Sequence, residues 1–201
     1  MLLGTGEEAK RGRCRSASHG GTLDRKGHQS KRAPRAAVAP HTRAKDLFYT
    51  LTLTVHSWVR WALVLVAALA FARSGYAFLR GREYAGADVS LAKGFIGLLN
   101  LQFTLGLVLY IFLSPTVRAA LSDLGAAMGS APLRFFVIEH QVAAIIAVGM
   151  GYAGVLRARK ATESRRKHRA IMLGGGGCLF MIFVAIPWPF LPYGRALLRF
   201  F

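Results

Sequence analysis

A few polar side chains stand inside the longest apolar stretches of this chain. His56 and Arg60 occur in Val-His-Ser-Trp-Val-Arg-Trp, and Glu139 and His140 close Arg-Phe-Phe-Val-Ile-Glu-His. Neutral imidazole is a strong metal ligand and costs less to bury than a charged ligand. Arg60 lies one helical turn after His56 and needs an anion at that depth. These residues predict either a metal held by two imidazoles or a buried ion pair.

The apolar stretches have the length of membrane-spanning helices. They occupy residues 47–72, 94–113, 135–156 and 170–190, and about 20 such residues in a helix cross a hydrocarbon core of about 30 Å. The connections between them are short and polar, so consecutive helices must be antiparallel neighbours. We therefore expect an all-α fold, a transmembrane up-down four-helix bundle in the lipid bilayer, formed by residues 46–201.

The charge of the chain is separate from its apolar stretches. The 201 residues include 27 Lys and Arg but only 9 Asp and Glu, and eleven of the basic residues fall within residues 1–46. This separation excludes a globular domain that binds nucleic acid, because such a domain carries its basic patch on a folded soluble core. We therefore expect no nucleic acid as a partner. Residues 1–45 show no apolar period and no secretory signal, so we expect a disordered basic leader. It is either a tail on anionic lipid or upstream sequence translated ahead of a true start near Val38.

Basic residues in the connections predict the orientation of the bundle. The first and third connections together carry eleven Lys and Arg, whereas the second connection and the C-terminal tail carry four. Basic residues resist translocation, so both ends of the bundle should face outward. The eleven basic residues of the leader contradict this orientation if the leader is part of the protein.

The two histidines are expected at one depth. His56 follows the start of its span by nine residues and His140 by five, which places them ~13 and ~8 Å past the outer ends. Two imidazoles at one depth on parallel helices suit the two axial positions of a haem. The face after His140 carries only small residues, and it either admits a neighbouring helix or leaves space for a flat macrocycle. These residues are Ala143, Ala144, Ala147 and Gly151.

Other polar and small residues have less specific interpretations. Arg60 can pair with Glu139, which would pin two helices without a cofactor, or with a haem propionate. Gln102 in the second span is expected to form an interhelical hydrogen bond. Alternatively, it lies beside a quinone headgroup or forms a hydrogen bond to a metal-binding side chain. His168, within Arg-Arg-Lys-His-Arg, is expected in a solvated basic loop and not as a ligand. The glycine run 174–177 predicts close helix packing.

Several segments together carry a resemblance to a known family. They are residues 56–61, the helix with Gln102, Gly106 and Tyr110, residues 121–128, residues 134–140, and Ile-Pro-Trp-Pro-Phe at 186–190 followed by Gly194 and Arg195. From about Phe48 onward the chain resembles small four-helix bacterial membrane proteins labelled cytochrome b-like. The resemblance implies the fold, a place in the bacterial inner membrane, and His56 and His140 as axial ligands with Arg60 and Glu139 beside them.

Two functions remain open at this point. The leading hypothesis is a b-type cytochrome that transfers one electron at a time through a bis-histidine haem b, to or from a quinone or a membrane redox complex. The alternative is a non-catalytic accessory or assembly subunit of a larger respiratory or photosynthetic membrane complex, held by an Arg60–Glu139 pair. A transporter is less favoured because the four spans show no inverted repeat of broken helices.

Overall fold

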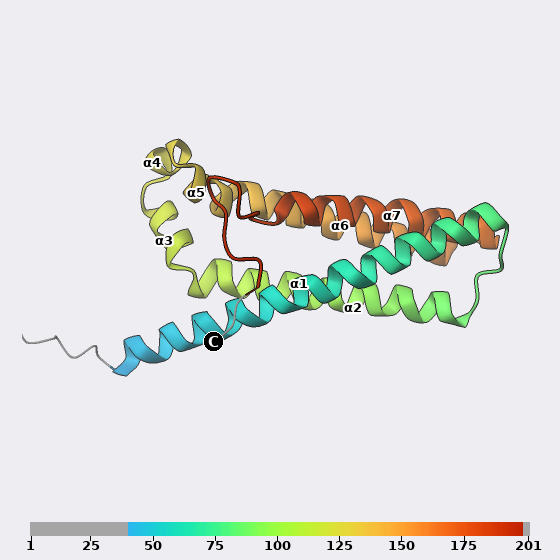
Figure 1. Cartoon of the computed structure of the whole chain (residues 1–201), viewed down its shortest axis with the longest axis horizontal. Coiled ribbons are helices and arrows are strands. Elements are labelled where there is room, and N and C mark those ends of the chain that lie inside the picture. Colours follow the sequence, from blue (N-terminus) through green and yellow to red (C-terminus); the bar gives the residue numbers. More distant parts are fainter. Residues whose placement is uncertain (1–39, 199–201) are drawn as a thin grey trace, which may run out of the picture. The chain divides into compact units, whose positions relative to one another are not determined.

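The computed structural model describes residues 40–198, and within this range the regular elements are all helical (Figure 1). Four long helices form the bundle: α1 (Pro40–Arg80), α2 (Gly86–Val108), α6 (His140–Lys160) and α7 (Ser164–Ala185). The π-helical segments η1 (Leu109–Leu113) and η2 (Phe135–Glu139) extend α2 and lead into α6, and α3 (Pro115–Ser122), α4 (Leu124–Gly129) and α5 (Ala131–Arg134) lie between them. The predicted leader up to residue 39 lies outside the described residues.

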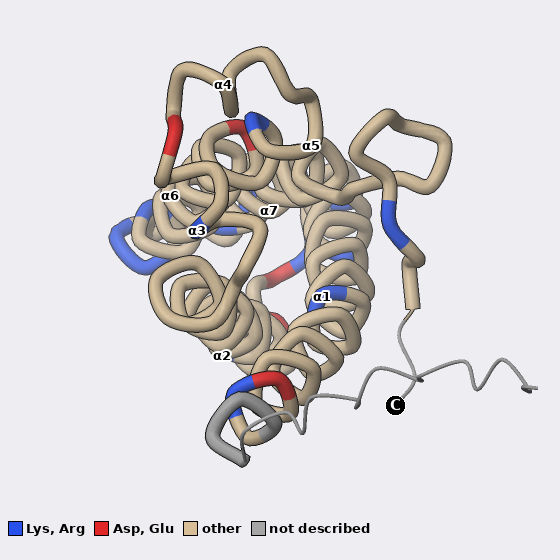
Figure 2. The backbone as a smooth tube through the Cα atoms, turned by 90° about the vertical axis from the view of Figure 1, so that its left-hand side faces the viewer, with Lys and Arg blue, Asp and Glu red and all other residues tan. Residues whose placement is uncertain are grey.

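The four helices pack in an up-down bundle, which confirms the predicted fold class. Figure 2 looks along the helices and shows α2 and α7 beside α1, with α6 across from α1. The α1–α2 connection turns at Gly81, whose φ of 64° lies in the left-handed region that favours glycine. At the other end of the bundle, the short helices α3 to α5 bridge η1 and η2.

The helices are longer than the apolar stretches that predicted them. The first begins at Pro40, inside the range assigned to the leader, and the polar connections shrink to residues 81–85 and 161–163. Lys and Arg are good helix formers, so the basic segments continue the helices instead of ending them. The fourth helix ends at Ala185, not at residue 190. Pro187 and Pro189 lack the N–H groups that would continue it.

The interior of the bundle is apolar and made largely of small side chains. Its core joins residues of all four long helices, among them Leu63, Ala67, Phe95, Ala147 and Ile171. Large apolar side chains also face outward, such as Leu65, which is 60% exposed, and Phe180, which is 63% exposed. A soluble protein rarely exposes so much apolar surface. All four long helices are apolar enough and long enough to cross a membrane, so the chain is a multi-pass membrane protein.

Helices α6 and α7 approach each other at paired glycines. A Cβ atom added at Gly154 would lie 2.8 Å from the Cα of Gly174, and 2.9 Å from the carbonyl oxygen of Ala170. No side chain fits at either glycine without separating the helices. The glycine run therefore serves close packing, as its composition predicts.

Candidate functional site

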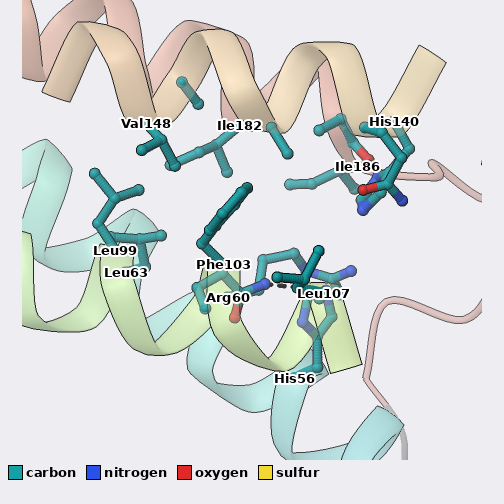
Figure 3. A pocket seen from close by; sticks show the side chains of 16 residues that line it. His56, Arg60, Leu63, Leu99, Phe103, Leu107, His140, Val148, Ile182 and Ile186 are labelled. Carbon is teal, nitrogen blue, oxygen red and sulfur yellow. Dashed lines mark hydrogen bonds between the residues drawn. The ribbon is translucent and has the colours of Figure 1, made fainter. Parts of the chain in front are cut away.

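His56 and His140 lie together in the structure. Their ring centroids are 6.5 Å apart and the ring planes are inclined by 60°. His56 projects from α1, and His140 is the first residue of α6, which lies diagonally across the bundle from α1. Figure 3 shows both side chains directed into the space between these helices and α2. The bundle thus brings the two imidazoles to one depth.

The ring of His140 is fixed by a backbone carbonyl at the end of α7. Its Nδ1 lies 2.8 Å from the carbonyl oxygen of Ala185. In a continued helix that oxygen would accept from the N–H of residue 189, but residue 189 is proline. A carbonyl oxygen only accepts, so Nδ1 carries the hydrogen and Nε2 keeps its lone pair. His140 therefore presents Nε2 as a potential ligand atom.

The ring of His56 contacts Gln102 and Gly106 of α2. The side-chain nitrogen of Gln102 lies 3.1 Å from Nε2 of His56. A Cβ atom at Gly106 would lie 3.3 Å from Cε1 of His56, so glycine makes room for the ring. Nδ1 of His56 is buried and has no hydrogen-bond partner among the described residues. One nitrogen of His56 thus contacts α2, and the other has no hydrogen-bond partner within residues 40–198.

Arg60 contacts the C-terminal tail, not Glu139. Its guanidinium donates to the carbonyl oxygen of Leu197 at 2.5 Å. Ser57 and Trp61 donate to the same oxygen, at 3.2 and 3.0 Å. The tail crosses from the end of α7 to α1 (Figure 1). The Nε of Arg60 is buried without a hydrogen-bond partner in the described part of the chain.

Glu139, the last residue of η2, forms its ion pair with Arg134, the last residue of α5. Its carboxylate accepts from Nε of Arg134 at 2.7 Å, and both side chains are close to half exposed. In a π-helix, residues five apart come level with each other because the hydrogen bonds run from i to i+5, and Glu139 closes η2 five residues after Arg134. The expectation of an Arg60–Glu139 pair is therefore wrong. Glu139 lines neither cavity at the histidines.

The spacing of the histidines suits two ligands of one metal. Two imidazoles bound through nitrogen at about 2.0 Å have ring centroids about 6 Å apart, close to the observed 6.5 Å. The described residues contain no group of three or more His, Cys, Asp or Glu that could hold a metal. A bare ion would therefore have two protein ligands here. A haem iron has four further ligands in the porphyrin itself, so the pair fits a haem better than a bare metal.

Two cavities flank the histidines and offer part of the space that a haem needs. Their volumes are about 70 and 90 Å³, and His56, Arg60, Gly106 and His140 line both. Together they are smaller than a porphyrin. Phe103 points into this space in Figure 3. A haem at this ligand pair therefore requires lining side chains such as Phe103 to move.

His168 is buried, so the expectation of a solvated loop residue is wrong. Its exposure is 0%, and its ring lies 5.0 Å from that of Tyr84. Because α7 begins at Ser164, the basic segment is helical, and the helical period turns His168 inward while Arg165 and Arg169 remain exposed. It lies at the far end of the bundle from His56 and His140, and it is not part of their site.

Sequence reasoning missed the backbone acceptors of this site. The carbonyl oxygens of Ala185 and Leu197 hold His140 and Arg60, and neither residue type signals a site. For Ala185 the available signal is Pro189, which removes the helical donor of the Ala185 carbonyl oxygen. No sequence signal marks Leu197. Comparison with protein-family models, with curated proteins and with solved structures found no match to this chain.

Proposed function

We propose that this chain is a b-type cytochrome in which His56 and His140 are the axial ligands of a haem b. The observation that carries the proposal is the 6.5 Å separation of the two rings, each with one nitrogen at hydrogen-bond distance from a protein group. The second nitrogen of His56, Nδ1, has no hydrogen-bond partner among residues 40–198. When bound, the haem supplies one-electron chemistry through its ferrous and ferric states.

The chain's own residues would orient the ligands and balance charge. Ala185 fixes the tautomer of His140, and the Gln102 amide, turned so that its oxygen accepts, would fix that of His56 with Nδ1 free. Arg60 supplies a positive charge, and its unpartnered Nε can donate to a propionate. Apolar side chains such as Leu63, Leu99 and Ile182 keep water from the pair.

The orientation of the bundle determines which partners can reach the site. The end of the bundle with the α1–α2 and α6–α7 connections is the more basic one, which favours the inner side of a bacterial inner membrane. The histidines then lie toward the outer side. A quinone in the bilayer or a membrane redox complex at that face is the partner that this position favours.

Substitution of each ligand tests the proposal. His56→Ala and His140→Ala should each abolish the low-spin spectrum, because loss of one axial ligand changes the ligand field. Gln141→Ala is the matched control, since Gln141 lines both cavities and its side chain donates to the carbonyl oxygen of Phe136 and not to either histidine. Haem retention unchanged in both histidine variants would contradict the proposal. A stably folded wild-type protein that binds no haem would favour the accessory-subunit function instead.

A further inference from the structure

A third cavity lies at the opposite end of the bundle from the histidine pair. Its volume is about 230 Å³. It opens between the start of α2, the last turns of α6 and the start of α7, beside the α1–α2 connection. The lining residues are Tyr84, Val89, Ala92, Lys93, Val155, Ala158, Arg159 and Lys167. No step of the proposed electron transfer uses this cavity.

The floor of the cavity is apolar and buried. Ala92, Val155 and Ala158 are each at most 7% exposed. These three residues pack in the main core between α2 and α6. The floor of the cavity is therefore formed by the packed core of the bundle.

The polar lining of the cavity is cationic. Lys93, Arg159 and Lys167 come from three different helices, and no ion pair joins any of them to a carboxylate of residues 40–198. Two nearby acidic groups are already paired: Asp88 with Arg73 at 2.6 Å, and Glu163 with Arg166 at 3.0 Å. Glu83, beside Tyr84 in the connection, is exposed and does not line the cavity. Three positive charges around one cavity that no carboxylate lines favour binding of an anion.

Tyr84 supplies a neutral polar group at the same cavity. Its backbone N–H donates to the hydroxyl of Ser164 at 3.1 Å, which ties the connection to α7. Its ring lies 5.7 Å from Nζ of Lys167. Burial, and after it the charge of Asp88, raises the pKa of Tyr84, so its hydroxyl stays protonated at neutral pH. That hydroxyl donates to the backbone carbonyl oxygen of Asp88 at 3.3 Å, so the phenol adds a polar surface and no negative charge to the cavity.

The geometry points to a binding site for a phosphate group, and at this depth for the headgroup of an anionic phospholipid. Basic pockets between transmembrane helices bind such headgroups. The apolar floor suits the glycerol and upper acyl region, and the exposed rim residue Val89 faces outward where an acyl chain would continue. The site is independent of the proposed haem.

Native mass spectrometry of the detergent-purified full chain tests this site. We expect phosphatidylglycerol to bind as one resolved adduct and phosphatidylcholine to bind far more weakly. The triple variant Lys93→Gln, Arg159→Gln and Lys167→Gln should lose on the order of 100-fold in affinity for phosphatidylglycerol. Val89→Trp, which keeps every charge and obstructs the mouth, should also weaken binding.

A charge-matched control separates this cavity from a general basic surface. Arg157→Gln, Lys160→Gln and Arg169→Gln remove three exposed charges at the same end, none of which lines the cavity. This control should retain phosphatidylglycerol. Competition by millimolar inorganic phosphate would support the site and assign it to a soluble phosphate. Equal losses in the two triple variants, or equal binding of the two lipids, would overturn the inference.

Discussion

Nδ1 of His140 donates to the carbonyl oxygen of Ala185, an oxygen that Pro189 leaves without a helical donor. Two sequence segments that lie far apart in the chain, Glu-His at 139–140 and Ile-Pro-Trp-Pro-Phe at 186–190, are therefore one structural unit. Pro189 leaves the Ala185 carbonyl oxygen without its helical donor, and this oxygen sets the tautomer of a candidate ligand.

Gln102 should support the ligand that it contacts. Gln102→Leu removes the hydrogen bond to His56, and loss of such a partner typically lowers metal affinity about 10- to 100-fold. We expect faster transfer of haem from the purified variant to an excess of an apo-globin, with the low-spin spectrum retained. Gln141→Leu, in the same cavities, should transfer haem at the wild-type rate. A transfer rate of Gln102→Leu equal to that of the control would show that Gln102 does not support His56 as a haem ligand.

Glu139 should be energetically coupled to Arg134 and not to Arg60. Double-mutant cycles with alanine should give about 0.2–1 kcal/mol for Arg134–Glu139, because both side chains are partly exposed. The Arg60–Glu139 cycle should give a coupling near zero. Thermal unfolding in detergent measures both. A larger coupling for Arg60–Glu139 would restore the ion pair that the sequence suggested and oppose the observed contact with Arg134.

The two glycines between α6 and α7 should tolerate substitution far less than a neighbour. Gly174→Ala places a methyl group against the backbone of Gly154, and overpacking of this kind costs about 1–3 kcal/mol. Gly175→Ala is the control, because a Cβ atom there has no heavy atom within 4 Å. We expect a lower Tm in detergent for the first variant and an unchanged or higher Tm for the second. Equal Tm values would contradict the close approach of these helices.

The sequence predicted the fold because span length and polarity suffice for it. Four apolar stretches with short connections leave an antiparallel bundle as the compact arrangement. The helix ends were predicted less well. Hydropathy predicts the end of an apolar stretch at the first charged residue, which need not be the end of the helix. Helix α1 includes Arg73 and ends at Arg80, because helical hydrogen bonding does not require apolar side chains.

The site could be predicted only in part. Histidines in apolar spans indicate a site, and their common depth follows from counting residues along parallel helices. The partner of Glu139 could not be predicted from an α-helical period, since η2 changes the local spacing to five residues. The contact of Arg60 with Leu197 depends on the path of the C-terminal tail, which no periodic pattern specifies.

The orientation of the bundle should follow its basic connections. Reporter fusions after residue 198 and within residues 161–163 should report opposite sides of the membrane, with the C-terminal fusion outside. An inward-facing C-terminal reporter would reverse the orientation. It would place the histidine pair near the cytoplasmic face and the basic cavity near the outer face.

The absorption spectrum of the wild-type protein shows whether the chain binds haem. The full chain is purified in detergent from haem-replete cells and measured in its oxidised and dithionite-reduced forms, with haem content determined per chain. We expect a Soret band, the visible bands of low-spin bis-histidine haem on reduction, and one haem per chain. A colourless protein that is stably folded, with the helix content and cooperative unfolding of an intact bundle, would contradict the proposal.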